Sequence, residues 1–346
     1  MSDDEDFDIG PDPTRPTLEN AADAGHPFSI CWSREVRSIL AGLDSDRFKD
    51  LDGPWAIESP FDVSTLRLSA VIPDSPGNGG ISSSGCYRDG LSTSSEHGTE
   101  HLSAALGITV GYPFLNASVT GKYDGRVSED RNASLQPPCA GVKASRNASC
   151  RVGRVVLNRT PTLSEKAIAI LQSPHGEELF RKRYGNYYVC GFALGADAGA
   201  CMSASTESRS SQETIAITVA VKVLFWSESA THTEVMTSQS HSSTLSFSGY
   251  STLDTGQPCA LDSKGASPRD EEELRKQAND YLVKVRELQT KVRDVMAEVG
   301  VVDGAELPLS DCARLCRSGL VVELLLTPYA RLNQYVSNAR LRQPGK

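Results

Sequence analysis

Two long segments of this chain alternate between apolar residues and polar or small residues. In the first segment, the apolar face consists of Leu102, Ala104, Leu106, Ile108, Val110, Tyr112 and Phe114. In the second, it consists of Ile215, Ile217, Val219, Val221, Val223 and Phe225. A period of two is typical of strands with one buried face, and these strands are longer than the usual ~5 to 6 residues. The pattern therefore predicts long antiparallel strands, and a Ser/Thr-rich alternation continues the second one to Tyr250.

Shorter elements are predicted between and after these strands. A helix begins at the capping-box sequence 162–165 and runs to Phe180, with a Ser-Pro-His-Gly interruption at 173–176. An apolar run from Tyr188 to Leu194 predicts a strand. A second apolar strand at 320–326 is followed by a short helix to about residue 341. Residues 74–95 are rich in Gly, Pro and Ser, which predicts a loop or very short strands.

Residues 267–299 predict a long amphipathic helix. Pro268 stands at its first position, and acidic residues fill its first turn. Its apolar residues alternate spacings of four and three: Leu274, Ala278, Tyr281, Val285, Leu288, Val292, Val295 and Val299. This spacing fits an oligomerisation seam of the coiled-coil type, and it fits equally well a single helix laid on the body of the domain.

The N-terminal part of the chain differs from the rest. Residues 1–26 are acidic and proline-containing, which predicts a disordered tail. Residues 27–54 predict a short segment of strand and helix that begins at Phe28, with the helix running through Arg37 and Leu43. Residues 55–346 are then expected to form the main domain, which includes the heptad helix.

Composition excludes several classes of function for this 346-residue chain. Its formal charge of -9 argues against nucleic-acid binding and against simple adsorption to anionic lipid. There is no run of about 18 apolar residues, and the N-terminus lacks the pattern of a secretory signal, so synthesis in the cytosol is expected. Nine cysteines, an odd number, predict buried thiols in a reducing compartment. Four sequons, at Asn116, Asn132, Asn147 and Asn158, would be glycosylation acceptors only in a secreted protein.

Catalytic signatures are weak or missing. The sequence contains no nucleophile elbow, no phosphate loop and no dinucleotide fingerprint. His97-Gly98-Thr99-Glu100-His101 matches a zinc-hydrolase string, but Gly98 interrupts it and no distal third ligand is evident. Cys312 and Cys316 have no matching second pair, so a structural zinc site is not expected. We therefore expect no enzyme activity, no cofactor and no small-molecule substrate.

The sequence from Phe180 to Ala196 contains an aromatic-glycine cluster, Tyr184-Gly185-Asn186-Tyr187-Tyr188, followed after six residues by Gly195-Ala196. This layout resembles the signature of the membrane-attack-complex/perforin (MACPF) family, Tyr/Trp-Gly-Thr/Ser-His-Tyr/Phe, six residues, Gly-Gly. Tyr184, Gly185, Tyr188 and Gly195 match, whereas Asn186, Tyr187 and Ala196 depart from the pattern. The resemblance implies an α+β fold in which a long, bent antiparallel sheet of about four strands is flanked by helices. The four matching residues would hold the junction at which the sheet bends.

The resemblance also implies a function. MACPF domains assemble into rings on membranes and insert β-hairpins, so membrane lipid and further copies of the chain are the expected partners. Residues 121–150 and 227–300 would supply the hairpins, and 320–326 would be the fourth central strand. Replacing Gly195 by valine is expected to leave folding nearly intact and to abolish lysis. The alternative is a non-lytic cytosolic scaffold that assembles through the 274–299 seam, which the polar 121–150 segment and Ala196 favour.

Overall fold

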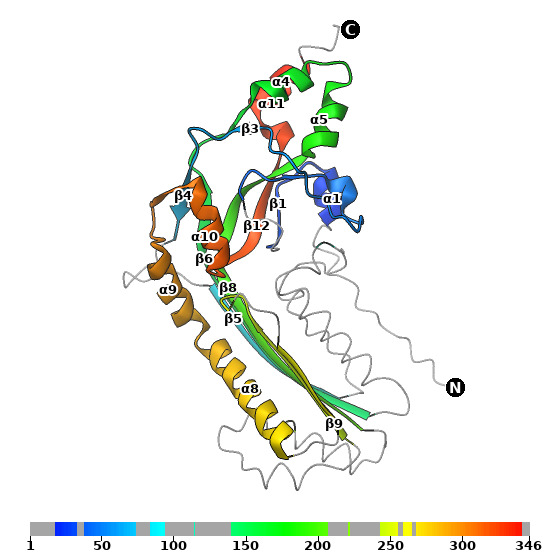
Figure 1. The fold of residues 1–346 in the computed structure, drawn as a ribbon, viewed down its shortest axis with the longest axis vertical. Helices are drawn as coiled ribbons and strands as arrows, with labels where there is room; N and C mark the ends of the chain where they lie inside the picture. The colour runs from blue at the N-terminus through cyan, green and yellow to red at the C-terminus, as the bar shows by residue number, and fades with distance from the viewer. Residues whose placement is uncertain are drawn as a thin grey trace, which may run out of the picture.

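A computed structural model describes residues 18–32, 38–73, 84–93, 114, 140–206, 221, 243–254, 259–264 and 268–340. Its main feature is one antiparallel sheet whose strands differ greatly in length. The longest strands extend beyond the body of the molecule as a narrow, twisted ribbon (Figure 1). The strands of this sheet are β1 (Phe28–Cys31), β2 (Gly42–Leu43), β4 (Arg67–Val71), β5 (Ser84–Thr93), β6 (Ala140–Leu157), β8 (Tyr187–Thr206), β9 (Ser243–Ser251), β10 (Cys259–Lys264), β11 (Glu306–Pro308) and β12 (Val321–Pro328). A separate pair consists of β3 (Phe61–Asp62) and β7 (Thr162–Leu163).

Strands β6 and β8 run the length of the sheet, and their neighbours change halfway. In the body, the strand order is β1-β12-β8-β6-β4-β11. In the extended ribbon, β5 pairs with β6, β9 pairs with β8, and β10 pairs with β9. Strand β8 leaves β12 after the Leu194–Val321 pair and meets β9 at the Ala198–Ser251 pair. Residues 195–197 of β8 lie between these two pairs, where one part of the sheet passes into the other. We call these residues, together with the adjoining residues of β6 and β12, the sheet corner.

Helices surround the body and cover one face of the ribbon. They are α1 (Leu18–Asp23), α4 (Glu165–Leu171), α5 (Gly176–Tyr184), α8 (Pro268–Arg286), α9 (Leu288–Val299), α10 (Cys312–Arg317) and α11 (Asn333–Arg340), with short 3-10 turns at Ser45–Arg47, Leu309–Asp311 and Tyr329–Arg331. Ser164 caps α4, because its Oγ accepts a hydrogen bond from Ala167 N at 3.3 Å. Of the described helices, none combines the length and the apolar character required to cross a bilayer.

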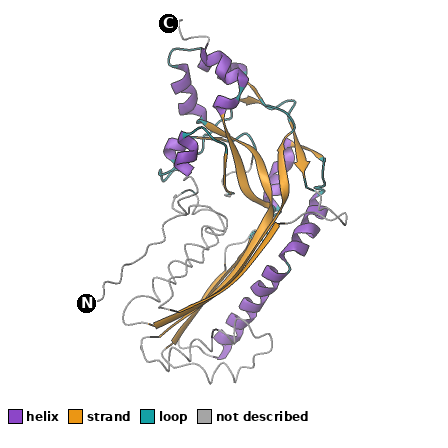
Figure 2. Cartoon of the chain, turned by 180° about the vertical axis from the view of Figure 1, so that it is seen from behind, coloured by secondary structure: helices purple, strands orange, loops and turns teal. Residues whose placement is uncertain are grey.

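The heptad helix lies along the ribbon (Figure 2). Every seam residue from Leu274 to Val299 is buried except Val295, which is half-buried. Met202 and Phe247 belong to the apolar face that α8 covers, and an ideal Cβ on Gly249 would come within 2.6 Å of Tyr281 Cγ. The seam is therefore occupied by the sheet in this structure, which is the second of the two arrangements that the spacing allowed.

Several predicted elements agree with the structure. The helix at 162–180 is present as α4 and α5, with its break at the predicted place. The 267–299 helix is present as α8 and α9, which are separated at Glu287. The strand at 320–326 is β12, and the helix after it is α11. The two longest predicted strands fall outside the described residues, apart from Phe114 and Val221, which are both buried. Phe114 lies in a turn and Val221 has a helical conformation, so the predicted strand is wrong at these two positions.

Other predictions are wrong. Within the predicted disordered tail of residues 1–26, Leu18–Asp23 form α1, whereas residues 1–17 lie outside the described residues. The predicted loop or set of very short strands at 74–95 includes the ten-residue strand β5. Residues 140–150, predicted to supply a hairpin, belong to the central strand β6. The predicted helix through Leu43 is replaced by a turn and β2 in its described part. Strand β12 pairs with only the first part of β8, and β9 is the neighbour of the rest.

Candidate functional site

The predicted signature begins where α5 ends. Basic residues fill the last turn of α5, where cations interact favourably with the helix dipole. Gly185 then stops the helix with φ +82° and ψ -168°, a conformation that is essentially restricted to glycine, and its N–H donates to Arg181 O at 2.7 Å. A Cβ on Gly185 would overlap the carbonyl oxygen of Leu43. Glycine is therefore required here by both conformation and space.

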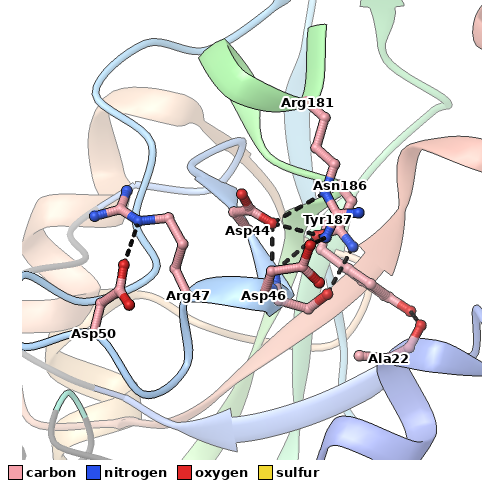
Figure 3. Close-up of polar contacts among 9 residues, drawn as sticks. Ala22, Asp44, Asp46, Arg47, Asp50, Arg181, Asn186 and Tyr187 are labelled. Atoms are coloured by element: carbon pink, nitrogen blue, oxygen red, sulfur yellow. Dashed lines mark hydrogen bonds and ion pairs between the residues drawn. The ribbon is translucent and has the colours of Figure 1, made fainter. Parts of the chain in front are cut away.

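Asn186 joins this turn to β2 and to the end of β12. Its backbone N–H donates to Leu43 O at 2.9 Å, and its backbone carbonyl accepts from Tyr329 N at 3.0 Å. Its side-chain Oδ1 accepts from Ser45 N at 2.9 Å, and its Nδ2 donates to Ser45 Oγ at 2.7 Å (Figure 3). An asparagine supplies this pair of bonds because its amide carries both a donor and an acceptor. The departure from the family pattern at Asn186 thus has a structural reason.

Tyr187 holds the N-terminal segment. Its phenol oxygen lies 3.0 Å from Ala22 O (Figure 3). The same oxygen lies 3.2 Å from His26 O, and the ring centroid lies 4.8 Å from that of Phe28. These contacts fasten α1 and β1 to the start of β8. Tyr187, which stands where the MACPF pattern has histidine, therefore anchors residues that the sequence predicted to be disordered.

Replacing Tyr187 by phenylalanine should loosen this anchor. The ring contact with Phe28 is retained and the phenol hydrogen bond is lost, which costs about 1 kcal/mol. We expect faster amide hydrogen exchange at residues 20–26 and little change in β6. Tyr335→Phe, which alters a half-buried tyrosine in α11, is the matched control. Equal exchange in the two variants would contradict an anchoring role for the Tyr187 phenol.

The other signature tyrosines belong to an aromatic cluster. The Tyr188 ring lies 4.9 Å from that of Phe61 and 5.2 Å from that of Tyr329, whose hydroxyl donates to Tyr184 O at 3.3 Å. The Tyr184 ring packs against Phe180 at 4.9 Å. Burial raises the pKa of Tyr188 and of Tyr329, so both phenols stay neutral. These side chains stabilise the junction by packing.

Ion pairs attach α4 and α5 to the loop that follows β2. Arg181 contacts both Asp44 and Asp46, and the Arg181 Nη2–Asp44 Oδ1 distance is 3.0 Å (Figure 3). On the neighbouring turn, Glu58 lies 2.8 Å from Arg183 Nη2 and 3.2 Å from Lys166 Nζ. Hydrogen bonds from Arg183 and then Lys166 lower the pKa of Glu58 from 4.5 to about 2.

This pKa shift predicts a dependence of stability on pH. Because the carboxyl pKa is lower in the folded state, the contribution of Glu58 is complete above pH 4.5 and is lost as pH falls towards about 2. The melting temperature of Glu58→Gln should therefore lie below that of the parent chain at neutral pH and approach it near pH 2. The side chain is exposed, so the difference should shrink in high salt. A difference that stays constant between pH 5 and pH 2 would contradict the assignment.

Gly195 lies in the sheet corner, apart from the aromatic part of the signature. It is paired with Arg151 of β6, next to a register shift between Arg151 and Gly153. Its N–H donates to Leu320 O at 2.8 Å, and a Cβ on it would overlap the carbonyl oxygen of Cys150. The structure thus brings Tyr184, Gly185 and Tyr188 together, and it places Gly195 one segment further along β8 at an irregularity of the sheet.

A buried charged cluster occupies the same corner, and the sequence reasoning missed it. Arg151 binds Asp197 through two hydrogen bonds, Nη1–Oδ1 at 2.8 Å and Nη2–Oδ2 at 3.2 Å. Its Nε lies 3.3 Å from Glu323 Oε1. The Asp197 side chain is 2% exposed, whereas those of Arg151 and Glu323 are 20% exposed. Asp197 is the sole charged residue in the small and apolar strand β8, and this was the available signal.

Comparisons with known proteins identify no family for the chain. No family model matches, and no curated protein matches. Solved structures similar to part of it include a non-hemolytic pneumolysin from Streptococcus pneumoniae (10% identity, TM-score 0.35, 87% of this chain and 59% of that one). Others are the cytotoxin suilysin from Streptococcus suis (11%, 0.34, 87% and 59%) and GNIP1Aa from Chromobacterium piscinae (16%, 0.28, 74% and 50%). The chain spans about three-fifths of the length of the first of these structures. With TM-scores below 0.5, these similarities establish neither the family nor the activity.

The remaining predicted sites can be placed in part. The histidine string at 97–101 lies outside the described residues, and within those residues no group of three or more potential metal ligands occurs. Cys312 and Cys316 are both buried in α10. Asn147 is buried within β6, a position that does not suit a glycan, whereas Asn158 is exposed and its Oδ1 accepts from Arg67 N.

Proposed function

We propose that this chain is a membrane-perforating protein that assembles into oligomers and inserts β-hairpins. The observation that carries the proposal is the order β5-β6-β8-β9 of four neighbouring strands in the ribbon, with β10 on the outer side of β9. The connection from β5 to β6 is residues 94–139, and the connection from β8 to β9 is residues 207–242. Both leave from the same end of the ribbon, since Thr93 pairs with Val142, Ala140 pairs with Thr206, and Thr206 pairs with Ser243. Two hairpins built from these connections would continue the existing strands.

The two connections have the length and sequence that insertion requires. A transmembrane β-strand needs ~9 to 11 residues, so each connection is long enough for a hairpin. The alternating segments 102–114 and 215–225 lie within them. Alternation with one apolar face is what a strand between lipid and an aqueous lumen needs. We therefore assign the inserting segments to 94–139 and 207–242, in place of 121–150 and 227–300, because 140–150 and 243–251 already belong to the ribbon.

Insertion in turn requires assembly. A strand edge in a bilayer leaves backbone groups without hydrogen bonds, and only a closed barrel removes every edge. Four strands per chain do not close a barrel with a lumen, so several copies are needed. Within the described part of the chain, the outer edge of β5 has no partner strand, whereas the outer edge of β9 is paired with β10. Self-association is therefore expected at the ribbon edges.

The alternative function, a non-lytic scaffold that assembles through the 274–299 seam, has less support. Leu274, Ala278 and Tyr281 pack into the apolar face of the ribbon. A seam in this position is available to a second copy only after α8 leaves the sheet. No observation on the described residues favours this route over pairing of strand edges.

Dye release from liposomes of total lipid extract, with negative-stain electron microscopy of the same samples, tests the proposal. The informative pair of variants is Val219→Arg, on the apolar face of the second alternating segment, and Thr218→Arg, on its polar face. Arginine at the bilayer midplane on a lipid-facing position costs ~2 to 4 kcal/mol per chain, and in the lumen it costs little. We expect loss of release in the first variant and retained release in the second, at similar melting temperatures.

Release accompanied by rings, with the difference between the two arginine variants, would support the whole proposal. Release that is equally affected by both variants would contradict insertion of residues 207–242 as strands. The absence of release by the parent chain, with soluble oligomers that vanish in Leu288→Asp, would overturn perforation in favour of the scaffold.

A further inference from the structure

The charged cluster of the sheet corner joins strands that are not neighbours. Strand β8 lies between β6 and β12, yet Arg151 of β6 contacts Glu323 of β12 across it. Arg151 also donates to the carbonyl oxygens of Cys150 at 3.1 Å and Ala196 at 3.4 Å. One guanidinium thus ties three strands together at a single point.

The corner contains further ties to the ribbon. The backbone N–H of Asp197 donates to Thr252 Oγ1 at 3.0 Å, and the N–H of Thr252 donates back to Asp197 O at 2.9 Å. Thr252 directly follows the last residue of β9, so the end of β9 nearest the body is bonded to the same aspartate that holds Arg151. A second register shift, between Val321 and Glu323, lies on the β12 side. The cluster therefore spans both irregularities, at the place where β8 changes its partner.

The physical chemistry of buried ion pairs indicates a role in conformation. Desolvation of the charges offsets most of their mutual attraction, so apolar side chains of similar volume stabilise a fold equally well or better. The best-attested use of such groups is to fix one register or one of two states. The cluster also has one cation for two carboxylates, so the more exposed Arg151–Glu323 contact is the one that separates at the lower cost.

We propose that Arg151, Asp197 and Glu323 form a latch that holds the corner of the sheet in its present bend. The Arg151–Asp197 pair stays intact, and the Arg151–Glu323 contact opens when β12 and the ribbon change their relative angle. The existence of the latch does not depend on the proposed function. Its role does, since that role is to delay opening of the sheet until the chains have assembled.

Glu323→Gln is the variant that tests the latch. Glutamine keeps the size of the side chain and removes its charge, while Arg151 keeps Asp197. Loss of the ionic attraction to Arg151 should raise amide hydrogen exchange at 189–197 and 321–326 in the free protein by roughly tenfold, because a neutral amide oxygen is a weaker acceptor than a carboxylate. The lag before dye release should shorten by a similar factor. Glu298→Gln, an exposed residue of α9, is the matched control and should change neither quantity.

The two readouts separate the latch from the proposed function. Faster exchange at the corner without any dye release by the parent chain would retain the latch and overturn perforation. Unchanged exchange in Glu323→Gln, at a melting temperature equal to that of the parent, would overturn the latch whatever the liposomes report. Dye release with an unchanged lag, together with faster exchange, would overturn its role in timing.

Discussion

Replacing Arg151 by methionine is expected to lower the free energy of unfolding by about 3 to 5 kcal/mol at neutral pH. Methionine retains much of the length of the side chain but leaves Asp197 charged and unpaired in the sheet, where its side chain is 2% exposed. Chemical denaturation followed by circular dichroism measures the change. A loss below about 1 kcal/mol would contradict the description of this pair as buried and coupled.

The loss should depend on pH and on Asp197. Burial raises the pKa of Asp197, and Arg151 opposes that effect. Without Arg151 the carboxyl pKa rises further, so the variant is least affected at acidic pH and loses stability as pH rises through the folded-state pKa. Adding Asp197→Asn removes the unpaired charge and should recover much of the loss at pH 7. An additive loss in the double variant would mean that the two side chains are not coupled.

Replacing Gly195 by alanine is expected to cost about 3 kcal/mol or more, and valine should cost at least as much. A Cβ at this position overlaps the carbonyl oxygen of Cys150, which is backbone and cannot move aside without breaking the β6–β8 ladder. The geometry therefore argues against the expectation from sequence that valine leaves folding nearly intact. A lysis defect in such a variant reflects misfolding unless its stability has been measured.

Gly304→Ala provides the control for Gly195→Ala. Gly304 has φ +70° with open space around the position of a Cβ, so alanine there meets only backbone strain of about 1 to 2 kcal/mol. The two substitutions add the same methyl group and separate strain from overlap. A Gly195→Ala variant as stable as the parent chain would contradict the packing described at the sheet corner.

The elements that the sequence predicted correctly are those with strong local signals. Helices α4 and α5 have a capping serine and a terminal glycine, and α8 begins at Pro268 with acidic residues after it. The apolar run of β12 is ended by Pro328. In each case the residues that define the element lie within the element itself, so no distant contact was needed to recognise it.

The errors share a different cause. Strand β5 and the first part of β6 contain many Gly, Ala, Ser and charged residues, and few of the β-branched and aromatic residues that favour strands. They are strands because β6 pairs with β8 over most of its length and β5 pairs with β6, which is information that lies far away in the sequence. Helix α1 is likewise held by the phenol of Tyr187. Sequence patterns do not reveal such tertiary contacts.

The candidate site was predicted in part for the same reason. Gly185 could be recognised because a glycine after a basic helix end is a local signal for a helix stop. The partners of Asn186, Tyr187 and Asp197 lie at Ser45, Ala22 and Arg151, and each contact requires the folded sheet. The roles of these three residues could therefore not be derived from the local pattern.

The most direct test of the central claim is to measure the membrane exposure of the second alternating segment. One cysteine is added in turn at each of positions 214–219 and labelled with a dye that brightens in lipid. The signal from the nine native cysteines is measured on the unmodified chain and subtracted. On addition of liposomes, labels at Ile215, Ile217 and Val219 should brighten, and labels at Thr214, Ala216 and Thr218 should not. This period of two is the predicted result. Labels that do not respond to liposomes, or that respond without alternation, would contradict insertion of this segment as a β-hairpin.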